Sequence, residues 1–185
     1  MLSTRNACLL AVLVGIAACG DSNGIGDATI PNVVDTFTVA SLDGGPLQAP
    51  AAYSIASNGV VRTYETTAFD FAYTSDQGKN YFLPLAVLGL SPGAALKPGL
   101  IPSDLAFDEI TKASQNGYIT EDTVQVDSGD VFMVRSSDIC TSLGVPQYAK
   151  LEIISIDPAA HTLTFQALAN NNCGFRGLNV GIPKD

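Results

Sequence analysis

Residues 149–156 read Ala-Lys-Leu-Glu-Ile-Ile-Ser-Ile, and residues 162–168 read Thr-Leu-Thr-Phe-Gln-Ala-Leu. Alternate positions of the first stretch differ in character. Leu151, Ile153 and Ser155 carry no charge, whereas the set formed by Lys150, Glu152 and Ile154 includes both charged residues. This period of two is typical of a strand with one buried face, and the other face is expected to carry the charge. Between the stretches, Asp-Pro-Ala-Ala-His at 157–161 predicts the turn of a hairpin.

The chain from Val33 onward has the same β character. β-Branched and aromatic residues predict further strands at residues 34–39, 52–56, 60–64, 67–73, 81–88 and 130–135. Asn58-Gly59 separates the second of these from the third, and both residues tolerate the positive φ of a tight hairpin turn. Pro84 lacks an N–H, which predicts a bulge or an edge position for that part of the chain.

One of these strands, residues 67–73, has aromatic side chains at alternate positions. Phe69, Phe71 and Tyr73 are expected on its buried face, and Asp70 on the opposite, solvated face. The polar residues 75–80 predict the turn that leads into residues 81–88.

Helix signals are few. Residues 107–113 are the best helical candidate but are short, and the three prolines of residues 91–106 predict a long loop there. Residues 114–130 are interpreted as a second loop region. We therefore predict an all-β fold, an antiparallel β-sandwich or flattened barrel of seven or eight strands with little helix.

The N-terminus carries a targeting signal. Residues 9–19 read Leu-Leu-Ala-Val-Leu-Val-Gly-Ile-Ala-Ala-Cys, with one basic residue, Arg5, before them. Small residues directly before Cys19 are typical of the cleavage site of a bacterial lipoprotein, in which that cysteine is acylated. The alternatives are an ordinary signal peptide that ends near a cysteine and a transmembrane helix. The apolar stretch is shorter than the roughly 20 residues that cross a bilayer.

This signal predicts the organisation of the chain and its location. Residues 1–18 are expected to be removed, 19–32 to form a flexible, glycine-rich tether, and 33–185 to fold as one domain. The mature protein is expected to be exported and lipid-anchored to the bacterial cell envelope. Because Gly20 rather than aspartate follows the cysteine, the outer membrane is the expected destination.

The net charge of the chain limits the macromolecules that it can bind, and the positions of its cysteines predict a disulfide. Removing residues 1–18 takes away Arg5 and no acidic residue, so the net charge changes from −9 to −10. Nucleic acid is therefore an unfavourable partner.

The four cysteines have different expected fates. Cys8 is lost with the signal and Cys19 takes the lipid, which leaves Cys140 and Cys173 to form a disulfide outside the cytoplasm. A metal site is the alternative, but further Cys or His at ligand spacing is missing.

Three patterns suggest chemistry, and each has a structural alternative. Gly89-Leu90-Ser91-Pro92-Gly93 matches the G-x-S-x-G of hydrolases, but Pro92 cannot supply the N–H that the oxyanion hole requires. Four acidic residues could ligate Ca²⁺ but also fit an ordinary turn: Glu121, Asp122, Asp127 and Asp130. The single histidine, His161, is expected to be an exposed turn residue. No set of nucleophile, base and orienting group can be assembled, so we do not predict an enzyme.

Several short motifs occur together in the C-terminal two-thirds of the chain. They are Phe-Asp-Phe-Ala at 69–72, Phe-Asp-Glu-Ile-Thr at 107–111, Gly-Tyr-Ile-Thr-Glu-Asp at 117–122, Gly-Asp-Val-Phe-Met-Val-Arg at 129–135 and Tyr-Ala-Lys-Leu-Glu-Ile at 148–153. In this order they resemble the HmuY-like family of bacterial surface lipoproteins. Phe69 stands where that family has tryptophan, and residues 138–146 insert a cysteine-bearing segment between its closing strands.

The resemblance implies a lipid-anchored β-sandwich, which in some relatives scavenges haem through two axial side chains. The histidine pair of those scavengers is missing here, and only His161 could serve, with Met133 or a second molecule as its partner. We therefore expect a non-catalytic protein without a resident cofactor. It is expected to bind a ligand or an envelope protein through loops 91–106 and 114–130, with haem binding through His161 as the alternative.

Overall fold

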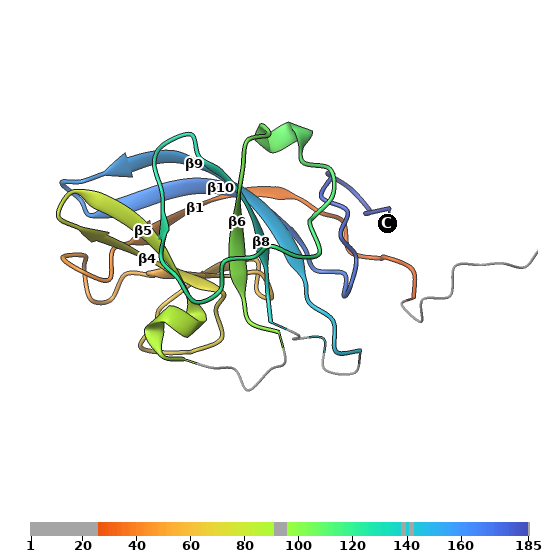
Figure 1. Cartoon of the computed structure of the whole chain (residues 1–185), viewed down its shortest axis with the longest axis horizontal. Coiled ribbons are helices and arrows are strands. Elements are labelled where there is room, and N and C mark those ends of the chain that lie inside the picture. The colour runs from red at the N-terminus through yellow and green to blue at the C-terminus, as the bar shows by residue number, and fades with distance from the viewer. Residues whose placement is uncertain (1–25, 91–95, 138–139, 141–142, 185) are drawn as a thin grey trace, which may run out of the picture.

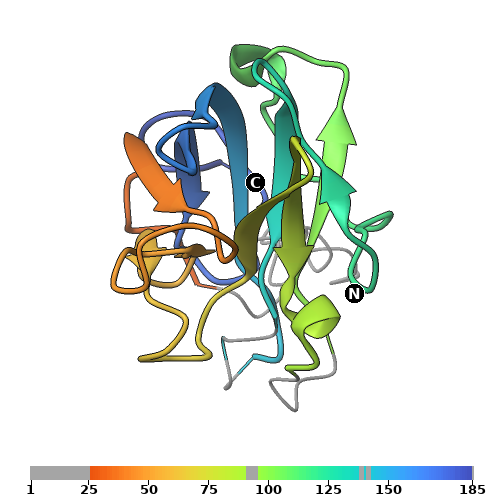
Figure 2. The same cartoon turned by 90° about the vertical axis from the view of Figure 1, so that its left-hand side faces the viewer.

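The computed structural model describes residues 26–90, 96–137, 140 and 143–184, and in this part of the chain the fold is an antiparallel β-sandwich (Figures 1 and 2). Two five-stranded sheets face each other, which confirms the predicted fold class. The ten strands exceed the seven or eight predicted. The predicted signal segment, Cys19 and residues 91–93 of the G-x-S-x-G match lie outside the described residues.

The first sheet contains the hairpin predicted for residues 149–168. Its strand order is β1 (Val34–Ala40), β10 (Thr162–Asn170), β9 (Tyr148–Asp157), β8 (Val131–Arg135) and β6 (Gly99–Ser103). The turn at 157–161 joins β9 to β10, as predicted, and a bulge interrupts their pairing between Thr164 and Phe165. The long β9–β10 pair is the centre of this sheet.

The second sheet covers the inner face of the first. Its order is β3 (Gly59–Val61), β2 (Ala52–Ser54), β4 (Phe71–Asp76), β5 (Lys79–Pro84) and β7 (Val124–Gln125). Asn58 has φ 41° in the turn between β2 and β3, as its sequence predicts. Pro84 ends β5 beyond the short pairing with β7, which involves only Tyr81 and Phe82. Its missing N–H therefore interrupts no ladder to β7.

Several predicted boundaries are wrong. The turn between β4 and β5 is only Gln77-Gly78, with φ 50° and 79°, so both strands run into the polar stretch 75–80. Residues 67–70 precede β4 instead of opening it. The second half of the predicted strand 81–88 forms a short 3-10 helix, η1 (Leu85–Leu88).

The expected loops also contain secondary structure. Residues 91–106 include β6, and residues 114–130 include β7. The expected helix at 107–113 is reduced to one 3-10 turn, η2 (Phe107–Glu109). Of the residues that the structure describes, none belong to a helix with the length and apolarity needed to cross a membrane.

Aromatic side chains fill the space between the sheets. Tyr53, Phe71, Phe82 and Phe165 are fully buried there, with ring centroids 4.5–6.5 Å apart. A second apolar cluster lies on the outer face of the first sheet, where it is covered by η2 and by the C-terminal segment, residues 171–184. Its members are Phe107, Ile110, Ala113, Val131, Tyr148, Leu168 and Leu178.

Lys150 and Glu152 lie on the outer face of β9, as predicted, but the outer layer covers Lys150. Lys150 is only 3% exposed, because η2 lies over it. Its ammonium group donates to the carbonyls of Phe107 and Ile110 at 2.8 and 3.0 Å, and it lies 4.5 Å from the centre of the Phe107 ring. Burial lowers the pKa of Lys150, and the nearby Asp108 opposes this effect.

The folded body begins before the expected boundary at Val33. The main-chain N–H groups of Thr29 and Ile30 both donate to the side-chain oxygen of Asn172, at 2.9 and 3.0 Å. Asn32 is buried and forms an antiparallel bridge with Gly181. The last part of the expected tether therefore belongs to the domain.

Candidate functional site

A cavity of about 290 Å³ opens at the end of the sandwich where β2 and β4 meet η1. Its lining residues come from four separate segments: Ser54, Ala56, Thr67, Ala68, Phe69, Asp70, Leu85 and Ser137. Most of this wall is apolar or carries a hydroxyl, and Asp70 supplies its one acidic group. A mainly apolar cavity with a few convergent polar groups is the usual form of a small-molecule site.

Asp70 is buried, which corrects the prediction that it is solvated. Its main-chain N–H donates to the carbonyl of Tyr53, and its carbonyl accepts from the N–H of Leu85. These bonds hold it between β2 and the start of η1, and only 5% of the residue is exposed. Phe69, expected beside Phe71 in the central core, instead packs with Ala72 and Leu85 in a third apolar cluster. Both faces of the chain are therefore covered at this point.

The carboxylate of Asp70 is only partly compensated. One oxygen, Oδ2, accepts the N–H of Ile55 at 2.7 Å. Burial raises the pKa of Asp70 to about 7, although this hydrogen bond acts in the opposite direction. The ion pairs within the described part of the chain, Arg62–Glu65 and Lys97–Glu121, do not include it. Asp70 therefore changes protonation near neutral pH in the wall of a cavity.

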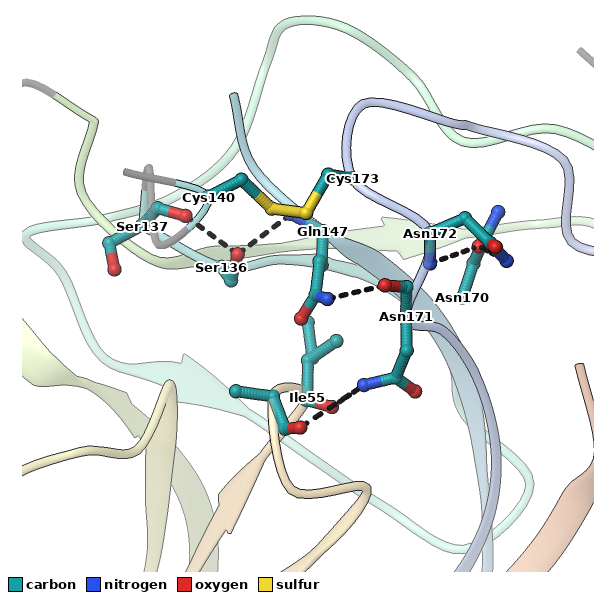
Figure 3. Close-up of a disulfide and its surroundings, with 10 residues drawn as sticks. Ile55, Ser136, Ser137, Cys140, Gln147, Asn170, Asn171, Asn172 and Cys173 are labelled. Carbon is teal, nitrogen blue, oxygen red and sulfur yellow. Dashed lines mark hydrogen bonds between the residues drawn. A yellow bond between two sulfur atoms is a disulfide. The ribbon is translucent and has the colours of Figure 1, made fainter. Parts of the chain in front are cut away.

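The predicted disulfide is present and lies next to this site (Figure 3). It joins Cys140, in the connection between β8 and β9, to Cys173, which follows β10, with a Cα–Cα distance of 5.9 Å. Ser136 links the same connection to β9. Its hydroxyl donates to the carbonyl of Ser137 at 2.7 Å and accepts from the N–H of Gln147 at 2.9 Å.

Asn171 continues this network to the turn after β2 (Figure 3). Its carbonyl accepts from the side-chain amide of Gln147 at 2.7 Å. Its own side-chain amide donates to the carbonyls of Ile55 and Ala56, at 2.9 and 3.2 Å. Ser137, which follows β8, and Ala56, which follows β2, both line the cavity and are therefore tied to one disulfide-linked segment.

Sequence reasoning missed this polar segment. Asn170, Asn171 and Asn172 are consecutive. The side-chain amides of Asn171 and Asn172 donate to the distant carbonyls of Ile55 and Ile30, whereas that of Asn170 donates to carbonyls a few residues further along the chain. A run of three asparagines directly after a strand is the signal that could have found them, because each amide both donates and accepts. Gln147 still has a buried side-chain oxygen without a hydrogen-bond partner among the described residues.

His161 and Met133 are not brought together. His161, expected to be exposed, is half-buried in the β9–β10 turn with φ 53°, and its ring packs against Gly44. Met133 pairs with Lys150 at the other end of β9. Seven residues of strand separate that position from Asp157, or about 23 Å along the sheet. One chain cannot bind the same iron through both side chains.

The acidic residues of the expected loop follow turn chemistry. The carboxylate of Asp130 accepts the N–H of Asp127 at 2.8 Å, and Gly129 has φ 90°, so these residues form a closed turn. Glu121 pairs with Lys97. Across the described residues, no group of three His, Cys, Asp or Glu side chains has the arrangement of a metal site.

A second cavity, of about 310 Å³, involves the loop regions that were expected to bind a partner. It lies between η2 and the C-terminal segment and is lined by Leu105, Glu109, Ile110, Thr111, Lys112, Ala113, Ser114, Met133 and Arg176. Its charged groups carry both signs: Glu109 and Lys112 are exposed, and Arg176 is half-buried and donates to the carbonyl of Ala113. It therefore lacks the buried, weakly compensated group found at Asp70.

Comparison with family models, with curated proteins and with solved structures finds no match for this chain. Its function is therefore inferred from the Asp70 cavity and from the signals of the sequence.

Proposed function

We propose that this chain is a lipid-anchored, non-catalytic binding protein of the bacterial cell envelope, and that it holds a small ligand in the cavity beside Asp70. One observation carries the proposal of a ligand: a buried carboxyl group with a single hydrogen bond among the described residues lies in the wall of a cavity. A buried carboxyl group with few hydrogen bonds lowers the stability of the fold. A ligand that donates further hydrogen bonds to it would restore that stability.

The wall indicates the chemistry of the ligand. A cationic or hydrogen-bond-donating group would pair with Asp70, and an apolar part would contact Phe69 and Leu85. The hydroxyls of Ser54, Thr67 and Ser137 add further polar contacts. An organic amine with an apolar body of modest size meets all three requirements.

Binding is favoured over catalysis because the hydroxyl groups are not activated. A serine or threonine nucleophile needs a base within hydrogen-bond reach. The hydrogen bond that Asp70 accepts comes from the main chain of Ile55, and within the described residues none of the three lining hydroxyls donates to it. Haem scavenging, which the family resemblance implies, would require a second molecule to provide the ligand opposite His161.

The ligand proposal can be tested with a matched pair of probes. 2-Phenylethylamine should raise the Tm of the purified protein at pH 8, and the uncharged 2-phenylethanol should raise it less, since only the amine pairs with ionised Asp70. Asp70→Asn should remove the difference between the two probes. Asp76→Asn is the control, because this exposed residue lies at the far end of β4. Equal responses of the two variants would contradict the proposed site.

The anchor is tested separately. Cells that express the full chain should incorporate an alkyne-labelled fatty acid into it, and Cys19→Ser should abolish this labelling and release the protein from the membrane fraction. Cys8→Ser provides the control, because Cys8 lies within the segment that cleavage removes. Labelling that persists in Cys19→Ser would contradict the lipoprotein assignment.

A further inference from the structure

We propose that the folded body rests on the bilayer through an exposed apolar patch beside its N-terminus, formed by Pro31, Val33, Val180 and Ile182. This inference rests on the proposed lipid anchor at Cys19. The four side chains come from the first and last segments of the folded body. In Figure 1 the described N-terminal residues and the C-terminus lie at the same end of the molecule.

The pairing of these two segments sets the direction of the side chains. Asn32 and Gly181 form an antiparallel bridge, with their N–H and carbonyl groups bonded both ways at 2.8 and 3.0 Å. The side chain of Asn32 points inward, where its amide donates to the carbonyls of Gly177 and Asn179. Because successive side chains of extended chain alternate, Pro31 and Val33 point outward beside Val180 and Ile182.

The side chains on either side of this bridge differ sharply in exposure. Asn32 is 1% exposed, whereas Val33 is 51%, Val180 72% and Ile182 51% exposed. Single exposed apolar side chains are common on proteins, but a contiguous group without charge is typical of an interaction surface.

The length of the tether between Cys19 and Thr29 indicates that this patch faces the membrane. Thr29 is already fixed to the body by Asn172, and it is the tenth residue after Cys19. Even a fully extended chain of ten residues reaches no further than about 35 Å. The anchored lipid therefore keeps this end of the body close to the membrane. The net charge of −10 disfavours anionic headgroups, so a surface rich in phosphatidylethanolamine fits the uncharged patch best.

The sequence contains no tryptophan, which allows a direct test. Val180→Trp places a single indole in the patch, and Leu47→Trp places one at a site that is 87% exposed in the connection after β1. Val33 lies just before β1, so the length of this strand, about 23 Å, separates the two ends. Each full-length, lipidated variant is reconstituted into phosphatidylethanolamine-rich vesicles with and without brominated lipid.

The indole at position 180 should shift its emission to the blue and be quenched by brominated lipid, and the indole at position 47 should do neither. Val33→Ser together with Ile182→Ser should reduce the quenching at position 180 several-fold. If the protein floats with the vesicles but both indoles stay unquenched, the anchor stands and this inference fails. If it does not float, both fail. A blue shift that depends on protein concentration without lipid quenching identifies a second copy as the occupant and also overturns the inference.

Discussion

The carboxylate of Asp70 accepts the main-chain N–H of Ile55 at 2.7 Å, while the carbonyl of Ile55 accepts the side-chain amide of Asn171 at 2.9 Å. The turn after β2 is thus held from both sides, by a buried acid that precedes β4 and by an amide beside the disulfide. Both contacts are made next to a cavity. Binding and stability are therefore expected to depend on the same few residues.

The pH dependence of stability should report the burial of Asp70. Its pKa rises from 3.8 in the unfolded chain to about 7 in the folded protein, so the folded state holds the proton more tightly. The associated stability is fully present below pH 4 and is lost as the pH rises to 7, by about 4 kcal/mol at most. Asp70→Asn cannot ionise. The free energy of unfolding of this variant, relative to the wild type, should therefore rise between pH 4 and 7 and stay level above pH 7.

Denaturant unfolding at a series of pH values measures this difference, since the other carboxyl groups contribute equally to both proteins. Asp76→Asn should run parallel to the wild type. A difference between Asp70→Asn and the wild type that does not change with pH would show that Asp70 is solvated.

Loss of the disulfide should weaken both the fold and the cavity. It closes a loop with a sequence separation of 33, for which chain entropy predicts about 4 kcal/mol of stabilisation. The double variant Cys140→Ser/Cys173→Ser should lose this amount in guanidinium unfolding. It should also bind an amine probe more weakly, because Ser137 is no longer held against the segment of Asn171. Unchanged probe affinity in the folded double variant would separate the disulfide from the site.

Lys150 should stabilise the outer layer of the first sheet. Lys150→Met keeps the apolar stem but leaves the carbonyls of Phe107 and Ile110 without their donor, which should cost about 2–3 kcal/mol. Amide hydrogen exchange should increase around η2 and remain unchanged in β4 and β5. The control is Lys112→Met, because Lys112 is exposed in the same segment. Equal effects of the two substitutions would contradict this role.

Haem should not bind one chain through two axial side chains. His161 and Met133 lie near opposite ends of β9, so haemin added to the purified protein should not give the spectrum of a six-coordinate, low-spin 1:1 complex. Titration followed at the Soret band measures this. A 1:1 complex of that kind that is lost in both His161→Ala and Met133→Ala would overturn the separation of these residues.

Much of the fold can be predicted from local pattern. The alternation in residues 149–156 and the turn signals at 58–59 and 157–161 predict hairpins that the structure contains. The disulfide follows from counting, because two of the four cysteines are assigned to the signal and the anchor. The strands that were missed, β6 and β7, are short and lie among prolines or polar residues, and they form because a neighbouring strand offers them partners.

The site could not be predicted in the same way. The pattern around Phe69 and Asp70 predicts one buried and one solvated face, but η1 and Leu90 cover the second face. The same is true of Lys150, which η2 covers although it lies about 40 residues away in sequence. In both cases the error has one cause, since alternation describes a strand and contains no information about what packs on its outer side.

The sequence by itself determined the β class, the hairpins and the disulfide partners, because each depends on neighbouring residues or on the number of cysteines. Only the tertiary structure decided that Asp70 lines a cavity, that Lys150 is buried and that Asn171 connects the disulfide to that cavity. Burial of a polar group depends on which distant segments exclude water from it, and that exclusion exists only once the chain has folded.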